Sequence, residues 1–198
     1  MCGKRCAASD VQKVMTNEVT YRQREMALGS YVAGYRDVRQ CERACRACPR
    51  YATTWICPPF TYDVEALLRS YCRIFLLGVQ IPLPAGTTVG ASLDVARPVV
   101  DAINERLLEL ERATEGFSLT FVGGCRYCGA AACTRPEGLP CRHPEKARPG
   151  LEAWGFDVAR TAAELLQLEM TWGRDGMAPP ALTLVFALLH NSPAAIAW

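Results

Sequence analysis

Two compact groups of cysteines constrain this chain more than any other feature. Each group spans seventeen residues, from Cys41 to Cys57 and from Cys125 to Cys141. The first has the spacing CxxxCxxC, then eight residues and a fourth cysteine; the second has CxxC, then a third cysteine after four residues and a fourth after seven more. Use of cysteine as a small core residue gives no reason for two such groups, whereas two four-thiolate metal sites do. The candidate ligands, called here the first and second quartets, are Cys41, Cys45, Cys48 and Cys57, and Cys125, Cys128, Cys133 and Cys141.

The choice of metal follows from how the cysteines are spaced. Iron–sulfur clusters are commonly held by three closely spaced thiolates and a fourth from farther along the chain, often followed by proline, as Cys57 is by Pro58. Zinc prefers two short pairs separated by about 12 to 20 residues, and each quartet contains only one CxxC. The spacing favours one or two iron–sulfur clusters, most simply of the 4Fe–4S type. Zinc in each quartet remains the alternative, because both metals accept four thiolates.

The composition predicts a single domain over residues 1–198, with residues 1–20 as a flexible N-terminal segment. Apolar residues make up 50% of the chain and charged residues 21%, which is ordinary for a globular protein. The 22 basic and 20 acidic side chains nearly cancel and form no long run, so no nucleic-acid partner is expected. No signal peptide is recognisable, and the longest apolar stretches are about half of a membrane span. We therefore expect a cytoplasmic protein without a membrane partner, in which eleven cysteines do not form structural disulfides.

Hydrophobic periodicity predicts an α/β fold. The expected elements are helix 61–71, strand 72–81, helix 92–117 with Pro98 as a kink or as its true start, strand 118–122, helix 156–170 with Asp157 as N-cap, and strand 181–190. Because a strand–helix–strand unit usually places its strands in parallel, strands 72–81 and 118–122 are expected to be parallel neighbours that bring the quartets together. The predicted fold class is a single α/β domain with a small sheet of about three to four strands, flanking helices and two cysteine-rich metal-binding loops.

The remaining histidine and cysteine residues have simpler interpretations. His143 follows the second quartet and is expected to be a loop residue, because Cys141 already completes the set of four. Cys72 stands at the start of a strand and is expected to be a buried structural thiol. Cys2 and Cys6 lie in a polar terminus that is expected to fray. The chain has no GxGxxG, GxxxxGK[ST], HExxH or GxSxG motif, so the sequence leaves open whether it is an enzyme.

Several residues near the quartets bear on how a metal would behave. Trp55 and Tyr51 are expected either to shield the first site from water or to belong to the core. Arg142, Lys146 and Arg148 form a basic group after the second quartet. Cations there would raise the potential of a negatively charged cluster, or else they belong to a solvated loop.

Two stretches of the chain resemble a known family. "CRACPRYATTWICPP" together with "GGCRYCGAAACTRPEGLPCRHPEKARPGLEAWGFDV" is similar to a bacterial and archaeal cysteine-rich family of predicted metal-binding proteins, over roughly residues 41–158. The family's cysteine positions fall on Cys41, Cys45, Cys57, Cys125, Cys128, Cys133 and Cys141, and the match to the family is weakest at Cys48. This chain departs from the family at Ala52, where glycine is usual, and at Gly150-Leu151, where serine and methionine are usual.

The resemblance implies a cytoplasmic metal or iron–sulfur protein, most frequent in anaerobes and sometimes near methyl-transfer or corrinoid systems. The sequence and the resemblance together predict electron transfer to a redox partner protein, or reductive activation of a partner metalloenzyme. The alternatives are a zinc-stabilised interaction module and an enzyme with one open-site cluster, in which Cys48 would be the cysteine that is not a ligand.

Overall fold

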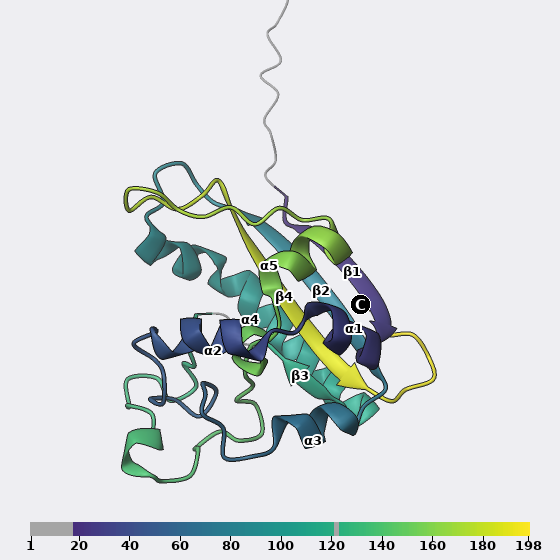
Figure 1. The fold of residues 1–198 in the computed structure, drawn as a ribbon. Coiled ribbons are helices and arrows are strands. Elements are labelled where there is room, and N and C mark those ends of the chain that lie inside the picture. Colours follow the sequence, from purple (N-terminus) through teal and green to yellow (C-terminus); the bar gives the residue numbers. More distant parts are fainter. Residues whose placement is uncertain (1–17, 121–122) are drawn as a thin grey trace, which may run out of the picture.

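A four-stranded sheet organises the chain in the computed structural model, which describes residues 18–120 and 123–198 (Figure 1). The strand order is β1-β2-β4-β3, and each neighbouring pair is antiparallel. The strands are β1 Thr20–Ala27, β2 Arg73–Pro82, β3 Phe117–Leu119 and β4 Ala181–His190. The helices are α1 Leu28–Tyr35, α2 Val38–Arg46, α3 Val64–Arg69, α4 Val89–Thr114 and α5 Val158–Arg160, which continues as a π-helical turn over Thr161–Leu165. Two 3-10 turns, η1 Arg135–Glu137 and η2 Glu152–Trp154, lie in the long connection between β3 and α5.

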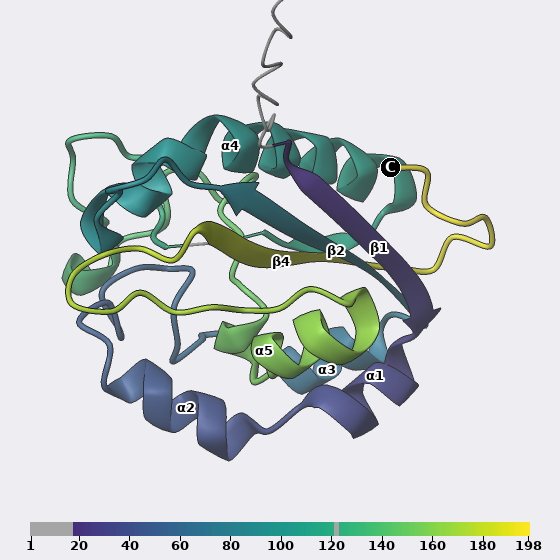
Figure 2. The ribbon, with the colours of Figure 1, turned by 90° about the horizontal axis from the view of Figure 1, so that it is seen from above.

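Helices cover both faces of the sheet (Figure 2). The long helix α4 lies on one face, and α1, α2, α3 and α5 lie on the other. Alternate residues of β2 enter the two resulting cores: Phe75 and Leu77 share a cluster with Ile103 of α4, and Ile74 and Leu76 belong to the opposite cluster. A strand buried on both faces reads as a continuous apolar run, which is why β2 and β4 were recognisable in the sequence.

The expected neighbourhood of the two strands that flank α4 is wrong. β2 and β3 do run in the same direction, but β4 lies between them and pairs antiparallel with both. The apolar side chains of β4 are buried on both faces of the sheet, so the free energy of burial favours a central position for this strand. The hydrophobic pattern of residues 72–122 cannot predict that a strand about sixty residues farther along the chain will pair between β2 and β3.

Most predicted elements are confirmed, with shifted ends. The long helix begins at Val89, where the Thr88 side chain accepts a hydrogen bond from the Ala91 N–H, and Pro98 lies inside it. Asp157 caps α5 as expected, but the helical turns stop at Leu165. Strand β1 and helices α1 and α2 were not predicted. The first seventeen residues, with Cys2 and Cys6, lie outside the described residues. Among the residues described, no helix has both the length and the apolar character to span a membrane.

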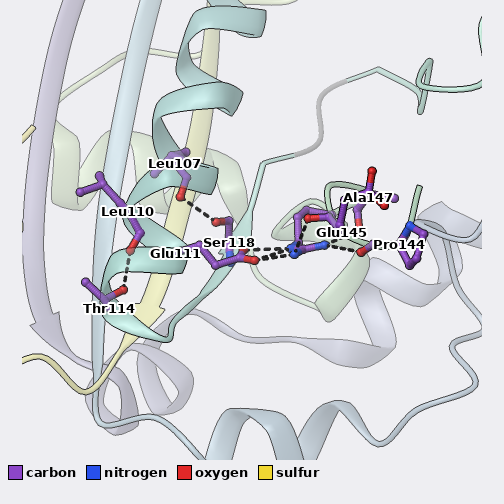
Figure 3. A network of polar contacts seen from close by, with 9 residues as sticks. Leu107, Leu110, Glu111, Thr114, Ser118, Pro144, Glu145 and Ala147 are labelled. Atoms are coloured by element: carbon purple, nitrogen blue, oxygen red, sulfur yellow. Dashed lines mark hydrogen bonds and ion pairs between the residues drawn. The ribbon is translucent and has the colours of Figure 1, made fainter.

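A buried ion pair fixes the end of α4 to the segment that follows the second quartet (Figure 3). The Arg148 Nε donates to both carboxylate oxygens of Glu111, at 3.1 and 2.9 Å, and both side chains are only 11% exposed. The Ser118 N–H of β3 donates to the same carboxylate at 2.7 Å, and Arg148 also donates to the carbonyls of Pro144 and Glu145. Burial alone would raise the pKa of Glu111, but the hydrogen bonds from Arg148 and Ser118 outweigh it, so the pKa is lowered.

We predict that Glu111→Gln destabilises the protein by about 3 kcal/mol, because it leaves the Arg148 guanidinium buried without its counter-charge. Urea unfolding followed by circular dichroism measures this loss. Glu109→Gln is the matched control, since Glu109 pairs with Arg106 at the exposed surface of the same helix and should cost less than about 1 kcal/mol. Equal losses in the two variants would contradict the role assigned to Glu111.

The lowered pKa of Glu111 also predicts an acid limb of stability. A carboxyl whose pKa is lower in the folded state contributes stability above its unfolded-state pKa of about 4.3, and this contribution is lost as the pH falls through the folded-state value. The free energy of unfolding, measured between about pH 7 and pH 3, should therefore fall less steeply in Glu111→Gln than in the unmodified protein. Parallel curves would show that Glu111 titrates normally.

Candidate metal centre

Helix α2 carries the first two cysteines of the first quartet. Cys41 and Cys45 are one turn apart, so their side chains lie on the same face of the helix. The helix starts after Asp37, whose side chain accepts a hydrogen bond from the Gln40 N–H at 2.9 Å. The Asp37 N–H donates to the Gly155 carbonyl, which docks the start of α2 on η2. The position of the two thiols is therefore set by a capped helix packed on the body of the fold.

The other two cysteines of the first quartet lie in the loop that follows α2. The Cys48 N–H donates to the Cys45 carbonyl at 3.0 Å, so the chain turns back directly after the helix. Cys57 comes later in the loop, where its N–H donates to the Thr54 carbonyl at 3.1 Å. Cys48 is exposed, whereas Cys41, Cys45 and Cys57 are partly buried.

The thiols of the first quartet influence one another's ionisation. Burial raises the pKa of Cys41 to about 11, and the neighbouring Cys45 adds to the rise. Burial likewise raises the pKa values of Cys45 and Cys57, and Cys48 contributes to both. Four neighbouring thiolates, three of them partly buried, are unfavourable together unless a positive charge lies among them, and a bound metal ion supplies such a charge. The donor set therefore fits a thiolate-ligated metal.

The second quartet lies in an irregular segment and lines one small cavity. The walls of this cavity contain all four of its cysteines, together with His143 and Tyr127. Tight turns shape the segment: the Gly129 N–H donates to the Arg126 carbonyl at 2.9 Å, and Gly129 has a φ of 59° that favours glycine. Burial raises the pKa of Cys125, and the thiols of the other three members add to the rise.

Main-chain N–H groups already point at sulfur atoms of the second quartet. The His143 N–H donates to Cys141 Sγ at 3.4 Å, and a backbone hydrogen bond from Tyr127 lowers the pKa of Cys125 against the effect of burial. Such hydrogen bonds stabilise a thiolate and tune a metal bound to it. Within residues 18–120 and 123–198, no three histidine, cysteine, aspartate or glutamate side chains already converge on a point that would hold one metal ion.

The two cysteine loops are fastened to each other by Arg135. This residue comes from the second loop, and its guanidinium donates to the carbonyls of Thr54, at 2.6 Å, and of Cys57 and Pro59 in the first loop. Trp55 returns the contact: its Nε1 donates to the Leu139 carbonyl at 3.1 Å. The segments that carry the two quartets therefore lie side by side, and side chains hold them together instead of neighbouring strands.

Trp55 does not lie where the sequence placed it. Although it stands between Cys48 and Cys57, its ring lines the cavity of the second quartet. Tyr51 does lie with the first quartet, in the wall of a groove that also contains Cys41 and Cys45. Trp55 lies with the second quartet because of how the two loops pack against each other, and a local sequence pattern does not predict such packing.

Other candidate residues have structural partners or positions outside the loops. Cys72 is exposed, so the expectation of a buried thiol is wrong; it stands in the turn before β2, outside the alternation of the strand. His190 is fully buried at the end of β4, with its Nε2 3.3 Å from a carboxylate oxygen of Glu25. His143 lines the second cavity and lies next to Cys141.

The basic group after the second quartet is engaged in contacts within the fold. Arg148 is buried against Glu111. Arg142 donates to the Ala132 carbonyl at 2.8 Å, and Lys146 lies 5.0 Å from the centre of the Tyr127 ring. The cations that do act on a cysteine are Arg135 and Arg50: burial raises the pKa of Cys57, and these two guanidinium groups oppose the rise. Neither Arg135 nor Arg50 was identified in the sequence analysis, because no local sequence pattern predicts that their side chains lie near Cys57.

Comparison with known proteins identifies a family of predicted metal-binding proteins. A family described as predicted metal-binding protein (DUF2284) matches residues 34–187, a range that contains both quartets and Arg135. No curated protein and no solved structure matches the chain. The match covers more than half of the chain and confirms the resemblance seen in the sequence. The chain therefore belongs to the DUF2284 family of predicted metal-binding proteins.

Proposed function

We propose that this protein binds two iron–sulfur clusters of the 4Fe–4S type, one in each quartet, and transfers electrons to or from a partner protein, either as a redox carrier or as a reductive activator of a partner metalloenzyme. When bound, such clusters supply reversible one-electron chemistry. The proposed ligands are Cys41, Cys45, Cys48 and Cys57 for the first cluster and Cys125, Cys128, Cys133 and Cys141 for the second.

The observation that carries the proposal is the locking of two separate four-thiol loops by one guanidinium group. A structural zinc site needs a single set of four ligands to staple a loop. Here each loop has its own set of four thiols, and the guanidinium group of Arg135 donates hydrogen bonds from the second loop to carbonyls of the first. A fixed spacing between two redox centres supports electron passage between them and onward to a partner.

The side chains around the loops suit a centre whose potential must be controlled. Trp55 and Tyr127 line the cavity of the second quartet and limit the access of water. Arg135 and Arg50 stabilise negative charge on Cys57, and the His143 N–H stabilises negative charge on Cys141. Partial burial, hydrogen bonds to sulfur and nearby cations are the factors by which proteins set cluster potentials.

The exposure of Cys48 favours a second candidate function. It is the one exposed member of the two quartets, and its match to the family is the weakest of the eight. If Cys48 is not a ligand, the first cluster has an iron position open to substrate, and the protein is an enzyme instead of a carrier.

We predict that protein purified without oxygen contains about eight iron and eight sulfide per chain, with a visible absorption that dithionite bleaches. The double variant Cys125→Ser/Cys128→Ser should lose about half of both. Cys72→Ser is the matched control, because Cys72 is an exposed cysteine outside the quartets, and it should leave the content unchanged. About two zinc per chain without sulfide would overturn the proposal in favour of a zinc-stabilised module.

Cys48→Ser separates the two iron–sulfur candidates. If all four thiolates of the first quartet are ligands, this variant loses iron from the first site as Cys45→Ser does. If Cys48→Ser keeps its full iron content while Cys45→Ser loses iron, the proposed function as an electron carrier is wrong, and an enzyme with an open iron position is the better account.

Arg135→Lys is predicted to lower the metal content of both quartets, because an ammonium group cannot reach three carbonyls as a planar guanidinium does. Arg142→Lys is the control, since Arg142 makes one such bond within the second loop. Iron and sulfide analysis, with electron paramagnetic resonance of the reduced protein, measures the effect. A loss confined to the second quartet would show that Arg135 does not join the sites.

A further inference from the structure

The sheet has an uncovered stretch of edge beside β4. Strand β3 pairs only with residues 187–189 of β4, so in the described chain the first half of β4 has a partner on the β2 side alone. Instead of a strand, a pocket of about 450 Å³ lies beside this half. Its walls come from β4, from the start of α4 and from the segment that runs back along the sheet between α5 and β4 (Figure 2).

The lining of this pocket is that of a small-molecule site. Most of its residues are apolar, among them Leu93, Met170 and Leu184. Trp172 belongs to the wall and is 74% exposed, a high value for so large an apolar side chain. A pocket of this size with apolar walls and few polar groups is the usual form of a site for a small organic ligand.

Glu152 is the single charged residue among those that line the pocket. In the part of the chain that the structure describes, its carboxylate forms no ion pair, and the one group that acts to lower its pKa is its own main-chain N–H. Although Glu152 is an exposed residue, enough protein surrounds its carboxyl group for burial to raise the pKa of that group. A carboxylate in this position lacks a counter-charge.

The space that the Glu152 carboxylate occupies exists because residue 150 is glycine. A Cβ atom at Gly150 would lie 2.7 Å from Oε2 and 2.8 Å from Oε1 of Glu152. A side chain at residue 150 would therefore contact the carboxylate where it now lies. In this chain the carboxylate is free of such a contact.

We propose that this pocket binds a small organic amine, whose apolar body lies between β4 and Trp172 and whose ammonium group pairs with Glu152. The apolar walls match the body of the ligand, the carboxylate matches its charge, and the indole ring offers a face to a cation. Glu152 also lines the groove that contains Cys41 and Cys45, so the ligand lies one side chain away from the first quartet. The site goes beyond the proposed electron transfer and does not depend on it.

Isothermal titration calorimetry of the full-length protein as purified tests this site with three probes that share a phenyl body: phenethylamine, phenethyl alcohol and 3-phenylpropionate. We expect phenethylamine to bind about tenfold more tightly than the alcohol, and 3-phenylpropionate to bind most weakly, because a charge-assisted hydrogen bond to Glu152 favours the cation. Equal affinity for the three probes, or no binding of any, would overturn the proposal.

Variants identify the pocket as the place of binding. Glu152→Gln should lower the affinity for phenethylamine to that for the alcohol, a loss of about tenfold, and Gly150→Ser should weaken it in the same direction. Ala178→Phe fills the pocket and should reduce the affinity for all three probes. Glu137→Gln is the control, an exposed carboxylate outside the pocket, and an equal loss there would overturn the assignment. Metal content, measured on each sample, separates this result from any failure of the iron–sulfur proposal.

Discussion

The central position of β4 is the constraint on which the rest of the fold depends. This strand pairs with β2 along its whole length and with β3 along its last residues, and it contributes apolar side chains to both cores. It is the last element along the chain, so the strand that completes the sheet lies C-terminal to both quartets. The segments that carry the quartets therefore lie between elements that are far apart in the sequence. Contacts made by these segments themselves must hold them in position. Arg135, Trp55 and the pair of Arg148 with Glu111 provide those contacts.

The parts of the fold that were predictable are those with a strong local pattern. β2 and β4 are long apolar runs, α4 has a clear apolar stripe, and Asp157 is a recognisable N-cap. β1 was missed because it is an edge strand whose polar residues face solvent, and α2 because its surface is polar and it buries no residue fully. Strand order was missed because β4 competes for the same edge of β2 from a distance that periodicity cannot report.

The same division applies to the candidate site. The grouping of the cysteines was visible in their spacing; in the structure the first quartet is divided between helix α2 and the loop after it, and the second lines one small cavity. The residues that connect the quartets were not visible, because Arg135 and Glu111 act on partners about forty to eighty positions away in the sequence. Trp55 illustrates the difficulty: sequence proximity assigned it to one quartet, and packing assigns it to the other.

The hydrogen bonds of the Arg135 guanidinium group couple the ordering of the two loops. Its guanidinium comes from the second loop and its acceptors are carbonyls of the first, so neither loop can adopt its final form without restricting the other. Whatever orders one loop lowers the conformational entropy that remains to be lost in the second. If each quartet binds a cluster as proposed, binding at one quartet therefore lowers the entropic cost of binding at the other.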